Sequence, residues 1–115
     1  MEIQIILAIV IAHWIGDYVL QTEKMAIGKA TSIKWLTIHV LVWTASIGVI
    51  TTLFGATFTW VAAMGVAHWI QDFVTAKINS HYQKTKQLKL FWLTIGSDQM
   101  LHYMVLFTTY YIWVA

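Results

Sequence analysis

This sequence has few charged side chains and lacks several residue types. Only 10% of its 115 residues are charged, 59% are hydrophobic, and it contains no cysteine, proline or arginine. Charged residues make up about a quarter of an ordinary soluble domain, so those present are too few to cover a water-exposed surface. The absence of cysteine excludes disulfides and thiolate metal sites. With no proline to interrupt its apolar runs, the composition indicates lipid as the surrounding solvent.

Four apolar segments are long enough to cross a bilayer. A membrane span needs about 20 mostly apolar residues at a rise of about 1.5 Å each, and segments near 2–22, 33–53, 58–77 and 90–114 satisfy this. Together they take up most of the chain. We therefore predict an all-α membrane protein with a single membrane domain over residues 1–115, folded as a bundle of four transmembrane helices.

The basic residues are confined to two of the connections between these segments. The lysines are Lys24, Lys29, Lys34, Lys77, Lys84, Lys86 and Lys89. The middle turn, residues 54–57, and both chain ends have none. By the positive-inside rule the two basic loops are cytoplasmic and both termini lie outside. Because arginine is absent and aromatic residues are few in these loops, we do not expect them to bind nucleic acid.

An internal repeat relates the two halves of the chain. Residues 12–19 read Ala-His-Trp-Ile-Gly-Asp-Tyr-Val, and residues 67–74 read Ala-His-Trp-Ile-Gln-Asp-Phe-Val. The tetrapeptide Trp-Leu-Thr-Ile also occurs twice, at 35–38 and at 92–95. The sequence therefore predicts a duplicated helical hairpin whose two copies run parallel to each other.

Histidine and aspartate recur inside the predicted spans at helical spacing. Three pairs are four residues apart, which places both members on one helix face: His13 with Asp17, His68 with Asp72, and Asp98 with His102. His39 adds a fourth histidine from the second span. Measured at about 1.5 Å per residue from the flanking lysines, these groups overlap in depth. We expect all four helices to contribute to one polar cluster.

Energetics make a passive role for this cluster difficult. Each aspartate at mid-bilayer costs about 2.5–3.5 kcal/mol even on a translocon-based scale, so the carboxylates must be protonated, paired with histidine or bound to a cation. Imidazole and carboxylate together suit a divalent transition metal, zinc above all. The predicted metal ligands are His13, Asp17, His39, His68, Asp72, Asp98 and His102. Interhelical hydrogen bonding and a metal-free proton relay stay open as alternatives.

The polar motifs also form an ordered set along nearly the whole chain. It consists of His13-Trp-Ile-Gly-Asp17-Tyr-Val-Leu-Gln21, Lys29, His39, His68-Trp-Ile-Gln-Asp72, Lys77 and Asp98-Gln99-Met-Leu-His102. This set resembles a family of small bacterial and phage membrane proteins, domain of unknown function 3307. The resemblance implies a four-helix protein of the bacterial inner membrane, and no settled activity. A looser similarity exists to membrane-bound metal-dependent hydrolases, whose glycine-bearing histidine signature this sequence lacks.

Three functions follow from such a cluster. The first is a metal-dependent hydrolase of a lipid or lipid-linked substrate, with Asp98 as ligand or general base and His39 as ligand or substrate-orienting residue. The second is a small transporter or channel for protons or metal ions; four helices leave little room for a path, so this function favours a homo-oligomer. The third is a non-enzymatic, phage-type module that binds a host membrane protein.

Overall fold

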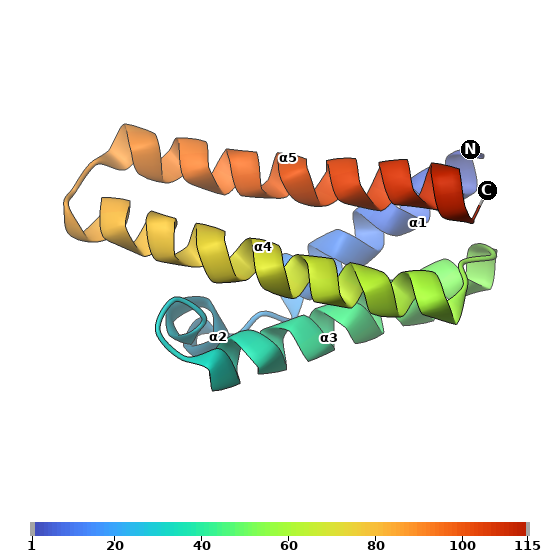
Figure 1. The fold of residues 1–115 in the computed structure, drawn as a ribbon, viewed down its shortest axis with the longest axis horizontal. Helices are drawn as coiled ribbons and strands as arrows, with labels where there is room; N and C mark the ends of the chain where they lie inside the picture. Colours follow the sequence, from blue (N-terminus) through green and yellow to red (C-terminus); the bar gives the residue numbers. More distant parts are fainter. Residues whose placement is uncertain (1, 115) are drawn as a thin grey trace.

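The computed structural model describes residues 2–114 as a bundle of helices (Figure 1). The long helices are α1 (Ile3–Trp14), α3 (Ile33–Thr51), α4 (Phe58–Lys84) and α5 (Leu88–Trp113), and the short helix α2 (Glu23–Gly28) lies between the first two. Helix α3 packs against α1 and α4, and α4 packs along α5. The prediction of an all-α bundle is confirmed.

Side-chain caps fix where several helices begin. The hydroxyls of Thr22, Ser32 and Thr57 accept hydrogen bonds from the third backbone N–H beyond them, at 3.3–3.4 Å, which satisfies a donor that the helix start leaves free. At the other end of α3, a 3₁₀ turn, η2 (Thr52–Phe54), leads to Gly55. Gly55 has φ +104°, a left-handed conformation that glycine adopts without steric cost.

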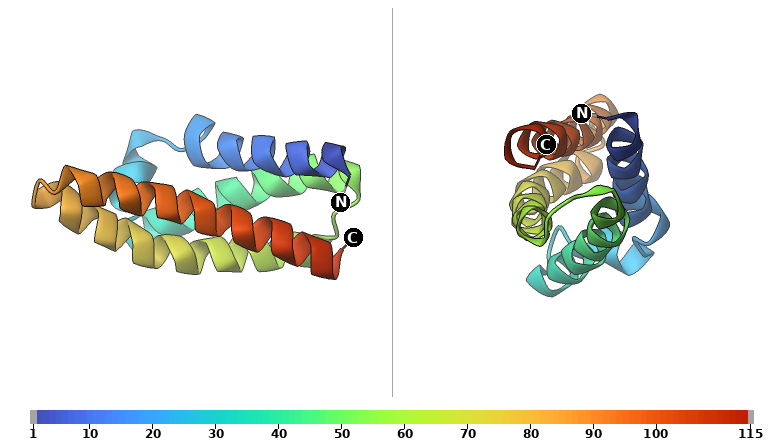
Figure 2. Two further views of the ribbon diagram at one scale, coloured as in Figure 1. Left: turned by 90° about the horizontal axis from the view of Figure 1, so that it is seen from above. Right: turned by 90° about the vertical axis from the view of Figure 1, so that its right-hand side faces the viewer.

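Two features of the helices differ from the predicted segments. Helix α4 continues to Lys84 instead of ending near residue 77, because the loss of hydropathy at Lys77 does not stop backbone hydrogen bonding. The first polar connection is not a simple loop, since it contains α2. Both additions lie at the end of the bundle that holds the 85–87 connection, opposite the two termini (Figures 1 and 2).

Helix α1 does not end as a regular helix but passes into one π-helical turn, η1 (Ile15–Val19). Such wide turns are rare and recur at functional sites. Gly16 lies in this turn directly against α3: a Cβ added there would stand 2.7 Å from Cδ1 and 3.0 Å from Cα of Trp43. The absence of a side chain thus lets η1 approach α3 closely, which places Asp17 beside the α3 backbone.

The interior of the bundle is divided along its length. The part nearer the termini is an apolar core. It consists of Ile5, Ala8, Ile9, Ala12, Trp43, Ile47, Trp60, Val61, Met64, Leu106 and Tyr110. The part nearer the 85–87 connection holds the histidines and aspartates. The polar cluster therefore has an apolar layer on one side and the lysine-rich end of the bundle on the other.

By length and hydropathy, one helical segment within residues 2–114 qualifies as able to cross a membrane, Ile33–Phe54. Ile3–Val19 is apolar but shorter. The prediction of four spans is not supported by this criterion for the other three segments. Helices α4 and α5 are long enough but fail the criterion on mean hydropathy. Their sequences include the buried histidines and aspartates, which lower the mean hydropathy although these side chains face inward.

Candidate metal centre

The structure brings all seven predicted site residues together inside the bundle. Four structural segments supply them: α1 with its continuation η1, then α3, α4 and α5. Each is buried, with at most 8% of its surface exposed. The seven are His13, Asp17, His39, His68, Asp72, Asp98 and His102.

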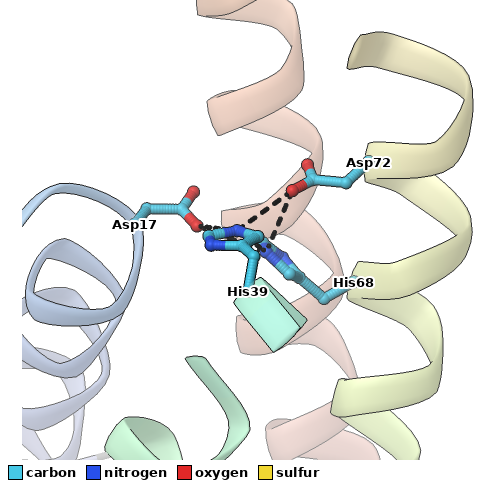
Figure 3. Close-up of side chains that lie close together, drawn as sticks. All are labelled: Asp17, His39, His68 and Asp72. Atoms are coloured by element: carbon cyan, nitrogen blue, oxygen red, sulfur yellow. Dashed lines mark hydrogen bonds and ion pairs between the residues drawn. The ribbon is translucent and has the colours of Figure 1, made fainter. Parts of the chain in front are cut away.

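Four of these residues form the tightest group (Figure 3). Nε2 of His39 lies 3.1 Å from Oδ1 of Asp17 and 3.2 Å from Oδ2 of Asp72. Nε2 of His68 lies 3.2 Å and 3.4 Å from the same two oxygens. The two Nε2 atoms are 3.2 Å apart. Two imidazole nitrogens and two carboxylate oxygens thus face one point.

Five of the six separations among these four atoms are close to the edge length of a tetrahedral zinc site. Four ligand atoms about 2.0–2.2 Å from a zinc ion are separated from one another by about 3.3–3.6 Å, and the five measured edges are 3.1–3.4 Å. Oδ1 of Asp17 has no well-aligned hydrogen bond despite these short contacts. Atoms that converge on one centre at these distances can hold a metal ion there. The prediction of a buried His/Asp group able to bind metal is confirmed.

The remaining oxygens of the same two aspartates face His102, the histidine of α5. Oδ2 of Asp17 lies 3.6 Å from Nδ1 of His102, and Oδ1 of Asp72 lies 3.4 Å from its Nε2. Asp98 Oδ1 also lies 3.3 Å from that Nε2 and accepts a 2.6 Å hydrogen bond from Thr75. The aspartates Asp17 and Asp72 therefore bridge the four-residue group to two further groups of metal-ligand type.

His13 holds its ring with two hydrogen bonds. The indole N–H of Trp43 donates to Nδ1 at 2.9 Å, so in the neutral ring the proton is on Nε2, which donates to Oε1 of Gln99 at 2.7 Å. His13 cannot ligate a metal through Nε2 while both bonds are kept. Gln99 in turn donates to Oδ2 of Asp17 at 3.2 Å. This series of hydrogen bonds, from Trp43 through His13 and Gln99, orients the carboxylate of Asp17.

His39 and His68 are positioned by packing, since their Nδ1 atoms have no hydrogen-bond partner among residues 2–114. Metal-bound histidines usually donate that N–H to an outer partner. Here the indole of Trp43 stacks on His68 instead, with ring centres 4.0 Å apart and an angle of 2° between the planes. Trp43 therefore contacts two of the histidines, one through its face and the other through its N–H.

Lys29 supplies a cation to the cluster. Its Nζ lies 3.3 Å from Oδ2 of Asp72, one of the four atoms of the tightest group, and its side chain is 18% exposed. The ammonium partly neutralises three clustered carboxylates in the absence of a metal. A bound divalent cation at the same oxygen would repel Lys29, because like charges a few ångströms apart destabilise each other in a poorly solvated site.

Sequence reasoning missed three of these positions. Thr75 carries a usable signal, because it follows Asp72 by three residues and therefore lies on the same helix face. Trp43 carries none, since tryptophan in an apolar span is expected to pack in the core or at the interface. Lys29 was interpreted as a topology signal and as a member of the family motif set, but its contact with Asp72 was not predicted, because nothing in the sequence shows that α2 folds back over the cluster.

Comparison with known proteins places the chain in a family. No curated protein and no solved structure matches it. Residues 5–115 match the family described as "Protein of unknown function (DUF3307)". This range includes every residue of the cluster. The chain belongs to the DUF3307 family, as the ordered His/Asp motifs indicated.

Proposed function

We propose that this protein is a multi-pass protein of the bacterial inner membrane that hydrolyses a lipid or lipid-linked ester at a metal ion held by the buried cluster. The four spans are α1 with η1, then α3, α4 and α5. The single observation that carries the hydrolytic part is a cavity of about 230 Å³ that reaches the cluster and is lined by Asp17 and Asp98. A purely structural metal site is closed, whereas a catalytic one keeps a position open for water or substrate.

The polarity of the bundle supports the membrane assignment. The histidines and aspartates of the cluster are buried, while large apolar side chains on all four long helices point outward: Ile3 is 62% exposed, Val49 68%, Val66 62% and Ile112 75%. A soluble protein rarely exposes apolar patches wider than a few hundred Å². In lipid this apolar outer surface would face an apolar solvent, while the buried aspartates and histidines lie away from it inside the bundle.

The distribution of lysine supports an orientation. The lysines lie around α2 and around the 85–87 connection, at the end opposite the termini. By the positive-inside rule that end is cytoplasmic. The candidate metal centre then faces the inner leaflet, where the head groups of lipids and lipid-linked substrates are within reach.

The chemistry follows from the residues at the cavity. Three of the four residues His39, His68, Asp17 and Asp72 would suffice to hold a metal ion, which would leave one position for a water and would lower the pKa of that water to about 7. Asp98 lines the cavity beside this group and would accept a proton from the attacking water. As the water oxygen bonds to the phosphorus or acyl carbon and the bond to the ester oxygen breaks, Asp98 would return the proton to the leaving oxygen.

The location of the apolar core favours hydrolysis over transport. A transport path must continue from the cluster to the other side of the bundle. Here Trp43, Ile9, Ile47 and Leu106, each at most 1% exposed, fill the layer between the cluster and the termini. The cavity, in contrast, extends toward the lysine-rich end. Access from one side is what an enzyme requires.

Metal analysis tests the proposal. We expect detergent-purified protein to contain about one zinc-like ion per chain by plasma mass spectrometry. Loss of an outer partner of a metal ligand weakens binding by about 10–100-fold, so His68→Ala, which removes a ligand, should weaken it at least as much. His81→Ala is the matched control, because His81 is exposed on the same helix. Equal metal content in both variants, with helicity intact by circular dichroism, would rule out the centre.

A further inference from the structure

The cavity beside the cluster differs from an acyl-chain groove in its lining. Nine of its twelve lining residues carry polar side chains. Its volume of about 230 Å³ is below the range of about 300–1,000 Å³ that is usual for pockets enclosing drug-sized molecules. It thus has room for one polar group and not for a whole lipid. The part of a substrate that reaches the metal centre is a small hydrophilic head.

Two side-chain amides in this cavity lack partners. Oε1 of Gln21 and Oδ1 of Asn79 are buried from water and have no hydrogen-bond partner among residues 2–114. Both residues line the cavity, one from the segment after η1 and the other from α4. A buried polar group without a partner destabilises the fold, so each of these amides gains from a ligand that pairs with it. Since an amide can turn to present either its oxygen or its NH₂ group, both are suited to a polar ligand.

The charged side chains around the cavity determine whether it can bind an anion. Lys29 is the only lysine of the cavity wall, and its ammonium lies beside Asp72. Two aspartates, Asp17 and Asp98, also line the wall. Without a metal, the carboxylates repel an anion. With a divalent ion between Asp17 and Asp72, the ion and Lys29 together balance the charge of Asp17, Asp72 and Asp98. The repulsion of an anion is then removed, and the ammonium released from Asp72 and the ion are both able to contact it.

We infer that the cavity binds the phosphate group of a phosphoester, with the metal ion and Lys29 as its two cationic partners. This rests on the proposed metal centre. Lysine is a common partner of phosphate, as a mobile point charge, and the amide side chains of Gln21 and Asn79, once turned to present their NH₂ groups, supply further hydrogen bonds. Of the two ester types considered above, the polar wall and the lysine favour the phosphoester over the neutral acyl ester.

The location of the cavity is consistent with the binding of a lipid phosphate head group. Asn79 lies about two helical turns from Asp72 toward the 85–87 connection, and Thr94 lies about one turn from Asp98 in the same direction. The cavity therefore leads from the cluster toward the lysine-rich end of the bundle. A membrane-anchored phosphoester and a soluble one share the phosphate chemistry and differ in the side from which they enter.

The experiment measures zinc and phosphate affinities separately by calorimetry. Inorganic phosphate is titrated into zinc-loaded protein in detergent. We expect Lys29→Gln to weaken phosphate binding by at least about tenfold and to leave zinc affinity unchanged or higher, since a cation beside Asp72 is removed. Lys29→Arg, which keeps the positive charge, should bind phosphate more tightly than Lys29→Gln and close to the level of the parent protein. Lys24→Gln removes the same charge from an exposed position of α2 and should stay within about twofold of the parent protein.

The outcomes separate this inference from the metal centre itself. If zinc binds but phosphate does not, or if Lys29→Gln binds phosphate as well as Lys24→Gln, the phosphate site is wrong and the metal centre stands. If zinc does not bind, the proposed function fails first. Competition by phosphatidic acid in nanodiscs, with phosphatidylcholine as the control, identifies a membrane source. Binding of inorganic phosphate without that competition identifies a soluble one, and both results support the phosphate site.

Discussion

At the residue scale, the two bridging aspartates define the chemistry of the centre. Asp17 and Asp72 each direct one oxygen to His39 and His68 and the other to His102. Bridging carboxylates of this kind let adjacent metal positions share ligands. Asp98 is not one of the four residues of the tightest group; it contacts His102 and shares a second candidate ligand group with His102 and Asp72. In the proposed function, the four-residue group would hold the ion and Asp98 would move a proton.

Asp98→Asn tests that separation. The change keeps the shape of the side chain and removes its ability to accept a proton. General-base catalysis contributes about 10²–10⁴-fold, so we expect kcat on a chromogenic phosphoester to fall by at least about 100-fold. The bound metal should stay near the level of the parent protein. Unchanged turnover would exclude Asp98 as the base, whereas loss of the metal would make it a ligand.

The identity of the cluster residues could be predicted from sequence, but their roles could not. The spacing of four placed each pair on one helix face, and the cost of three buried carboxylates required a partner for them. His13 nevertheless differs from its repeat equivalent His68. His13 is hydrogen-bonded to Trp43 and Gln99 and lies outside the four-residue group, whereas His68 is a member of that group and its Nε2 faces Asp17. Such a difference between repeated motifs depends on contacts from other helices.

At the scale of single elements, the π-helical turn η1 controls the position of Asp17. A π turn places an extra residue in the helix, so Asp17 is set against α3 by the contact between Gly16 and Trp43. The short distance between this turn and α3 depends on glycine. The spacing in the sequence predicts a regular helix through Asp17 and gives no sign of the wider turn.

Gly16→Ala should therefore disturb both packing and metal binding. A methyl group 2.7 Å from the indole and 3.0 Å from backbone Cα of Trp43 forces the segments apart. Overpacking of this kind costs about 1–3 kcal/mol of unfolding free energy, measured by SDS titration of the protein in detergent. Bound metal should also decrease, because Asp17 moves away from His39.

Gly96→Ala is the matched control for that change. Gly96 lies in α5, and an added Cβ there meets nothing within 4 Å. Alanine is favoured over glycine inside a helix by about 0.5–1 kcal/mol, so this variant should be slightly more stable and should bind metal normally. If the two glycine variants behave alike, the close approach of η1 to α3 is not what positions Asp17.

At the scale of the whole molecule, the orientation in the membrane gives the clearest test. Because the chain has no cysteine, single cysteines introduced at Lys86 and at Thr57 can be labelled without background. We expect an impermeant maleimide added to intact inverted vesicles to label Lys86→Cys, and the same reagent added to right-side-out vesicles to label Thr57→Cys. Labelling of Lys86→Cys only in right-side-out vesicles and of Thr57→Cys only in inverted vesicles would show that the topology is the reverse of the one proposed. Equal labelling of both cysteines from one side would show that the helices between them do not cross the membrane.

The sequence by itself determined that the chain is all-α, that it belongs to the DUF3307 family, and which histidines and aspartates are buried together. These properties follow from hydropathy and from spacing within one helix, and both are local. Only the tertiary structure decided that Asp17 and Asp72 face His39 and His68 at one point, that Lys29 folds back to Asp72, and that a cavity opens at Asp98. Distances between atoms of different helices depend on how those helices pack, and no residue spacing along the chain encodes them.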